Sequence, residues 1–212
     1  MKRQLALIAL GAALFCAGYV LAEQKEAPQV RRIVTKLDDS GKAVVMLDER
    51  APMSGVRPPN YVANIWVTEK SLPDFSSTAD RGKTKTGLTP PKGGSVFRIV
   101  EFMPEPESIT RLDLNTMQRV VGAADTPKKG LPPRHPMMHR TRTLDYAIVL
   151  AGEIDMLLDE GEVHVKAGDI LIQRGTNHAW VNRGAKACRI VFVLIDAKDF
   201  PPPDGRSFPQ PG

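Results

Sequence analysis

Residues 168–182 read GDILIQRGTNHAWVN, and this stretch decides the fold. A Gly-Asp turn leads into an apolar run, a second glycine ends that run, and another short run begins at His178. Because successive side chains of a strand point to opposite faces, His178, Trp180 and Asn182 share one face. The stretch therefore predicts two strands joined by a turn, with an imidazole, an indole and an amide on one side of the second strand.

The same pattern of short apolar runs and turns extends over residues 95–197. Glycine and aspartate separate the runs, and no segment has the length and period of an amphipathic helix. The predicted strands cover residues 95–102, 145–150, 153–158, 162–165, 170–173, 178–182 and 189–195. Many short strands with such turns are typical of a barrel or a sandwich, so we expect an all-β domain.

The N-terminus has the features of a targeting segment. Residues 1–22 combine a positive start, an apolar stretch and small residues up to Ala22, which predicts a signal peptide cleaved before Glu23. The apolar stretch is also long enough to be an uncleaved anchor. In both cases we expect a periplasmic or secreted protein. Cleavage would leave Cys188 as the one cysteine, and its apolar surroundings in the sequence predict a buried, inert thiol.

Residues 23–94 precede the dense strand pattern and differ from it. Two β-rich runs, 31–37 and 43–47, flank a turn, and a polar loop rich in Thr, Lys, Pro and Gly follows over 72–94. We expect these strands and the long loop to pack on a barrel formed by residues 95–197. A Pro-rich tail, residues 198–212, completes the chain.

The composition is that of an ordinary globular protein. The 212 residues are 42% hydrophobic and 25% charged, with a formal net charge of +5. No run of Lys and Arg is long or interleaved with aromatic residues, so no nucleic-acid partner is expected.

The stretch 168–182 resembles the second conserved motif of the cupin superfamily. That motif consists of a Gly-Asp turn, a strand, a glycine three residues before a histidine, and an asparagine four residues after it. The resemblance covers about residues 93–196. It implies a cupin-type double-stranded β-helix, that is, a jelly-roll barrel, here with an N-terminal β-rich arm. Many cupins dimerise by exchanging strands, so the resemblance also implies a homodimer to which residues 31–47 contribute.

The first cupin motif, which supplies two histidines and a glutamate, is incomplete. Asp145 lies seven residues before Gly152, at the position of the family's glutamate, and His139 lies six residues before Asp145. The resemblance therefore implies a metal site of His139, Asp145 and His178 that could hold Fe, Mn, Zn, Ni or Cu. In the alternative interpretation, Asp145 and His178 are hydrogen-bonded groups without a metal.

The remaining candidate site residues surround these three. Trp180, Asn182, Gln173 and Arg140 are expected to line a ligand pocket. Of the other two histidines, His135 is expected on the surface of a Pro-rich loop and His164 on an exposed hairpin strand.

Two functions remain open. The first is a divalent-metal-dependent enzyme of oxygenase, isomerase or lyase type that acts on a small organic substrate. The second is a non-catalytic periplasmic protein that binds or senses a small molecule. One barrel supports many chemistries, so the resemblance alone does not choose between them.

Overall fold

The computed structural model describes residues 27–57, 59–111 and 134–198. These residues form eleven strands and two short 3-10 helices, η1 (Arg81–Lys83) and η2 (Glu107–Arg111). The described chain is therefore all-β, as predicted. The expected signal peptide and all but the first residue of the Pro-rich tail lie outside this part of the chain. Among the described residues, no helix has the length and apolar character needed to cross a membrane.

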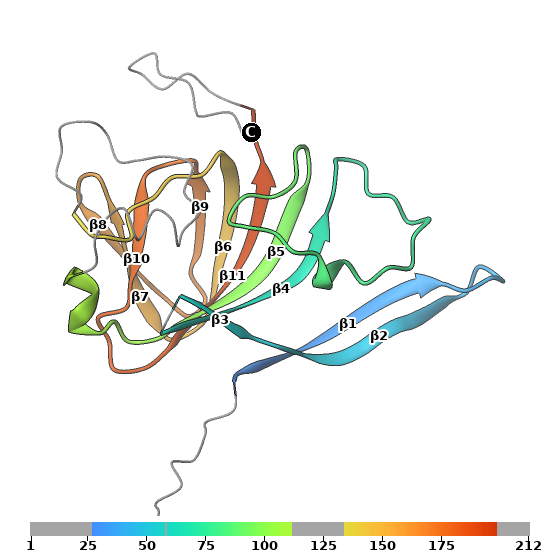
Figure 1. Ribbon diagram of the computed structural model, residues 1–212, viewed down its shortest axis with the longest axis horizontal. Helices are drawn as coiled ribbons and strands as arrows, with labels where there is room; N and C mark the ends of the chain where they lie inside the picture. Colours follow the sequence, from blue (N-terminus) through green and yellow to red (C-terminus); the bar gives the residue numbers. More distant parts are fainter. Residues whose placement is uncertain (1–26, 58, 112–133, 199–212) are drawn as a thin grey trace, which may run out of the picture.

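Two antiparallel sheets form the barrel (Figure 1). The larger sheet has the strand order β3-β4-β5-β11-β6-β9, and the smaller sheet has the order β10-β7-β8. Their bounds are β3 (Ser54–Arg57), β4 (Asn60–Thr68), β5 (Ser95–Phe102), β6 (Thr143–Ala151), β7 (Glu153–Leu158), β8 (Glu162–Lys166), β9 (Ile170–Arg174), β10 (His178–Val181) and β11 (Cys188–Asp196). This arrangement confirms the predicted jelly-roll barrel.

The register of the central strands fixes which side chains face the barrel interior. Phe192 on β11 lies between Arg98 on β5 and Ala147 on β6, and Leu194 pairs with Asp145 in the next inward row. Because side chains alternate along a strand, all five belong to the inner face of the larger sheet. The inner face thus carries two ionisable groups within an apolar surface.

The core fills the space between the two sheets. Strands β6, β7, β8 and β11 contribute one cluster of buried side chains, which includes Cys188, Ile190 and Phe192. Burial raises the pKa of the Cys188 thiol to about 11, consistent with the predicted inert cysteine. At the β6–β7 turn, Gly152 has a φ of +75°, and a Cβ there would lie 2.5 Å from the carbonyl oxygen of Ala187. Only glycine fits this turn.

The outer face of the larger sheet remains partly apolar. Tyr146 and Ile148 on β6 pair across the sheet with Ile172 and Ile170 on the edge strand β9. All four side chains are exposed, from 37% for Ile148 to 69% for Ile170. The expected homodimer stays a prediction, because a single chain does not show what covers this face.

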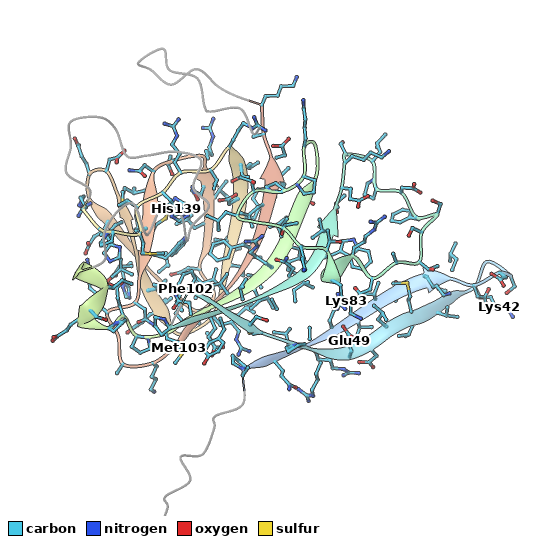
Figure 2. The ribbon with its side chains drawn as sticks, in the orientation of Figure 1. Lys42, Glu49, Lys83, Phe102, Met103 and His139 are labelled. Atoms are coloured by element: carbon cyan, nitrogen blue, oxygen red, sulfur yellow. The ribbon has the colours of Figure 1, made fainter. Side chains whose placement is uncertain are left out.

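The N-terminal arm is a hairpin of β1 (Gln29–Leu37) and β2 (Ala43–Pro52). It extends away from the barrel in Figure 1, and Figure 2 shows Lys42 at its far tip. The arm is held near the barrel by Arg32, whose side chain is only 4% exposed. Arg32 donates to Asp80 at 2.7 and 2.8 Å, to the carbonyl oxygen of Ile65 at 3.1 Å, and to Glu49.

We expect Arg32→Met to loosen the arm, because removing one partner of a buried ion pair leaves its carboxylates uncompensated, at a cost of about 3 kcal/mol. Arg31→Met is the matched control, since the Arg31–Asp48 pair is mostly exposed and water screens the attraction between its charges. Urea unfolding and amide exchange in β1 and β2 measure the difference. Equal effects of the two substitutions would show that Arg32 does not anchor the arm.

Candidate functional site

A cavity of about 130 Å³ lies inside the barrel. Its walls are mostly apolar and aromatic: Tyr61, Leu88, Val100, Phe102, Ile109, Met137, Trp180, Phe192 and Leu194. The rings of Phe102, Trp180 and Phe192 contact one another, with centroids 5.6–6.3 Å apart. Five acidic or basic side chains also line the cavity: Arg98, Glu105, His139, Asp145 and His178. An apolar pocket with a few convergent polar groups is typical of a small-molecule site.

Backbone pairing brings His139 and His178 together. The N–H of each residue donates to the carbonyl oxygen of the other at 2.9 Å, which forms an isolated antiparallel bridge. Their ring centroids are 4.4 Å apart. Figure 2 shows His139 inside the barrel. The predicted proximity of these two histidines therefore arises from the segment before β6, which pairs with β10.

The ring of each histidine is oriented by a backbone carbonyl. The Nδ1 of His139 lies 2.8 Å from the carbonyl oxygen of Met137, and the Nδ1 of His178 lies 3.0 Å from that of Thr176. Since a carbonyl oxygen only accepts, the Nδ1 of His139 carries the proton. The Nδ1 of His178 lies 3.0 Å from the Nε2 of Gln173 as well, so Thr176 and Gln173 together hold this ring. Full burial lowers the pKa of His178 to about 4, and His178 is therefore neutral near pH 7.

Asp145 is a buried carboxyl group in the same cavity. It is 5% exposed, and the hydroxyl of Thr143 hydrogen-bonds it. Its Oδ1 is buried without a hydrogen-bond partner, which costs about 1–3 kcal/mol for a polar atom. Burial raises the pKa of Asp145 to about 6, against the opposing effects of Thr143 and the positive charge of Arg98.

Arg98 is a site residue that sequence reasoning missed. It is 7% exposed, and its Nη2 donates to the carbonyl oxygen of Gly87 at 2.8 Å and to Thr86 Oγ1 at 3.3 Å. Its Nε is buried without a partner, and burial lowers its pKa to about 10. The signal was present in the sequence, because strand alternation puts Arg98 on the apolar face of Val96 and Val100.

The four predicted pocket residues occupy different places. Trp180 lines the cavity, whereas Gln173, Asn182 and Arg140 are not among its lining residues. Gln173 faces inward opposite Asp145 and donates to the carbonyl oxygen of Thr176 at 3.1 Å. Its amide thus supports the turn that holds His178.

Asn182 has a structural role at the end of β10. Its amide donates to the carbonyl oxygens of Phe102 and Lys186, both at 2.8 Å, and accepts from the N–H of Gly184. These bonds join the ends of β10 and β5 and close the turn before β11. The sequence interpretation of Asn182 as a ligand-contacting residue missed this, because alternation gives the face of a side chain and not its partners.

The two remaining histidines have different outcomes. His164 is exposed as predicted, and its Nδ1 lies 2.8 Å from Asp155. The prediction for His135 is wrong, because this residue is only 7% exposed. Its Nδ1 accepts from the N–H of Met137 at 3.1 Å, and its Nε2 lies 3.1 Å from Glu105.

The metal set of His139, Asp145 and His178 stays a prediction, although all three side chains line the cavity. In the parts of the chain that the structure describes, no three His, Cys, Asp or Glu side chains are placed to hold a metal ion. The two imidazoles are oriented through Nδ1 as metal ligands often are, but Asp145 does not join them as a third ligand. His139, Asp145 and His178 therefore line one pocket without fitting a three-ligand metal centre.

Comparisons with known proteins give the relationships of the chain. The family model described as the cupin domain matches residues 126–194. Phomopsin biosynthesis cluster protein D of Diaporthe leptostromiformis is 34% identical over 189 residues, which cover 84% of this chain and 85% of that protein. The cupin-domain-containing oxidoreductase srdD of Neurospora crassa is 28% identical over 194 residues, with coverage of 86% and 84%.

A solved structure is also similar, at a low level. It is a putative ethanolamine utilization protein from Salmonella typhimurium, with 9% identity and a TM-score of 0.40. The match covers 81% of this chain and all of that one.

The two named sequence relatives come from fungi and include a protein named for a biosynthesis cluster. A fungal cell has no periplasm of the bacterial kind, so these relatives contradict the predicted periplasmic or secreted location. That prediction is wrong, and the interpretation as a periplasmic binding or sensing protein finds no support in these relatives. A matched cupin domain, together with 34% identity over most of both chains, establishes that this protein belongs to the cupin family.

Proposed function

We propose that the protein is an enzyme that catalyses proton transfer on a small organic molecule, in a reaction of isomerase or lyase type. The main support for this proposal is the buried carboxyl group of Asp145, whose Oδ1 has no protein partner inside an apolar, aromatic cavity. Relatives named as cupin-domain-containing oxidoreductases support an enzyme. We assign the reaction class from the side chains of this pocket.

Asp145 acts as the general base and then as the general acid. It takes a proton from a substrate carbon next to a carbonyl group, and the electrons of that C–H bond form an enolate. The same carboxyl group returns the proton to the rearranged carbon framework, so the charge and proton count balance. A carboxyl pKa of about 6 suits this role, since a catalytic pKa near the working pH is the most effective.

His178 positions the substrate in this scheme. Thr176 and Gln173 hold its Nδ1, which leaves Nε2 to hydrogen-bond a substrate hydroxyl or carbonyl group. The aromatic rings around the cavity exclude water, which would otherwise compete for the enolate.

The proton-transfer step is tested by exchange in D₂O. Small enolisable carbonyl compounds that raise the melting temperature are incubated with the protein, and NMR follows deuterium incorporation next to the carbonyl. We expect Asp145→Asn to lower the exchange rate by roughly 10²–10⁴-fold, the contribution typical of a general base. Tyr146→Phe is the control, because Tyr146 is the next residue on β6 and faces outward.

An unchanged exchange rate in Asp145→Asn would overturn the role of this carboxyl group. Compounds that bind without any exchange in the wild-type protein would identify a binding protein instead of an enzyme.

The pH dependence of stability tests the charge states of Asp145 and His178. The folded-state pKa of Asp145 is raised to about 6, so its contribution to the free energy of unfolding falls by about 3 kcal/mol as pH rises from 4 to 6. The folded-state pKa of His178 is lowered to about 4, so its contribution falls by about 3 kcal/mol as pH drops from 6.5 to 4. The two contributions nearly cancel in the wild-type protein.

Single substitutions should therefore reveal opposite slopes between pH 4 and 6. In Asp145→Asn the His178 contribution remains, and stability rises with pH more steeply than in the wild type. In His178→Gln the Asp145 contribution remains, and stability falls with pH relative to the wild type. Urea unfolding at several pH values measures both slopes, and parallel curves for all three proteins would contradict these charge states.

Chelation provides a separate test of the metal-independent scheme. We expect protein treated with EDTA and dialysed to keep the D₂O exchange rate of untreated protein, because no three-ligand centre is formed by the described side chains. A rate that disappears with EDTA and returns with one added divalent metal would contradict the proposed role of Asp145 as the sole proton-transfer group.

A further inference from the structure

The cavity contains an unusual pair of polar atoms without partners. Both Arg98 Nε and Asp145 Oδ1 are buried and make no hydrogen bond with the protein. Arg98 is 7% exposed and Asp145 is 5% exposed, and both side chains line the cavity. One atom is a donor on a cation and the other is an oxygen of a carboxyl group, so the cavity offers complementary polar contacts at two points.

The sheet register keeps these two groups apart. Arg98 is on β5 and Asp145 is on β6, with β11 between them. The two residues are also offset along the strands, because Arg98 is level with Phe192 of β11 and Asp145 is level with Leu194, two residues further on. Phe192 pairs directly with Arg98, and Leu194 pairs directly with Asp145. The charge of Arg98 acts on Asp145, but the two side chains form no ion pair. The apolar residues Phe192 and Leu194 of β11 therefore lie between the cation and the carboxyl group.

The position and hydrogen bonds of Arg98 suit an anion-binding residue. Its Nη2 is oriented by two neutral acceptors, the carbonyl oxygen of Gly87 and the hydroxyl of Thr86, so no carboxylate hydrogen-bonds the guanidinium group among the described residues. The Nε–H of Arg98 is the donor left for a ligand, and a charge-assisted hydrogen bond from it to a carboxylate oxygen is strong in an apolar cavity, where little water competes. The aromatic side chains of Phe102, Trp180 and Phe192 would contact the rest of the ligand.

From this arrangement we propose that the substrate is a small organic carboxylate with an apolar body, bound through its carboxylate to Arg98 and with its reacting carbon at Asp145. This inference rests on the proposed enzymatic function, since it assigns a substrate class to the same cavity. It replaces the expectation that Arg140 lines the pocket, because Arg98 supplies the buried cation instead.

Matched pairs of ligands test the substrate class on the wild-type protein. Benzoate, phenylacetate and phenylpyruvate are compared by calorimetry with their neutral primary amides, which have nearly the same shape. We expect each carboxylate to bind roughly tenfold to a hundredfold more tightly than its amide, as for one charge-assisted contact. Equal affinities for the acids and the amides would overturn the proposal without the need for any variant.

Variants of Arg98 assign the preference to this residue. Arg98→Met should remove the preference for carboxylates over amides, and Arg98→Lys should keep part of it, because lysine retains the charge but lacks the Nε–H donor at its place in the cavity. Arg189→Met is the control, since Arg189 is on β11 and pairs with Glu101 on the outer face at 2.8 Å. If Arg98→Met does not fold, Arg98→Lys decides, and an unchanged preference in that variant overturns the assignment.

The failure of this inference can be told apart from the failure of the proposed function. Carboxylates that bind through Arg98 but show no exchange in D₂O would support the ligand class and contradict the enzyme. Neutral ketones that exchange at Asp145, with no preference for carboxylates, would support the enzyme and overturn the ligand class.

Discussion

The loss of water around ionisable groups inside an apolar barrel is the constraint on which the site depends. Burial favours the neutral form of each of these groups, because a charge is less stable away from water. It raises the pKa of Asp145 and lowers the pKa of His178 and of Arg98. Each residue is compensated differently. His178 loses its charge, Arg98 keeps its charge and donates to two neutral acceptors, and Asp145 retains one oxygen without a partner.

These groups occupy one cavity because strand pairing brings together residues from distant parts of the sequence. Strand β11 at the centre of the larger sheet aligns Arg98 with the first motif region, and the bridge between residues 139 and 178 joins that region to the smaller sheet. The long loop before β5 contributes Gly87, which orients Arg98. The cavity is therefore a product of the whole barrel and does not belong to a single motif.

Much of this could be predicted from the sequence. Alternation and turns predicted the strands, and the second motif predicted the barrel. The two motifs together predicted that Asp145 and His178 lie in one pocket, and both line the cavity. These features depend on local periodicity, which the sequence carries directly.

The remaining features depend on distances between side chains that are far apart in the sequence. Motif spacing could bring His139, Asp145 and His178 to one pocket, but it could not determine whether their donor atoms converge on a metal. Asn182 was assigned to the pocket because of its face, whereas its amide completes the turn before β11. The N-terminal segment suggested a location that the fungal relatives contradict, since an apolar stretch does not specify a kind of cell.

The acidic position of the first motif carries the group that the proposed chemistry needs. An aspartate stands there in place of the family's glutamate, so the carboxyl group is one methylene shorter. Burial raises the pKa of Asp145 to about 6, and its Oδ1 makes no hydrogen bond with the protein. A carboxyl group in this state can exchange a proton with a ligand that supplies the partner that the protein lacks. The burial of Asp145 therefore favours its use as an acid–base group.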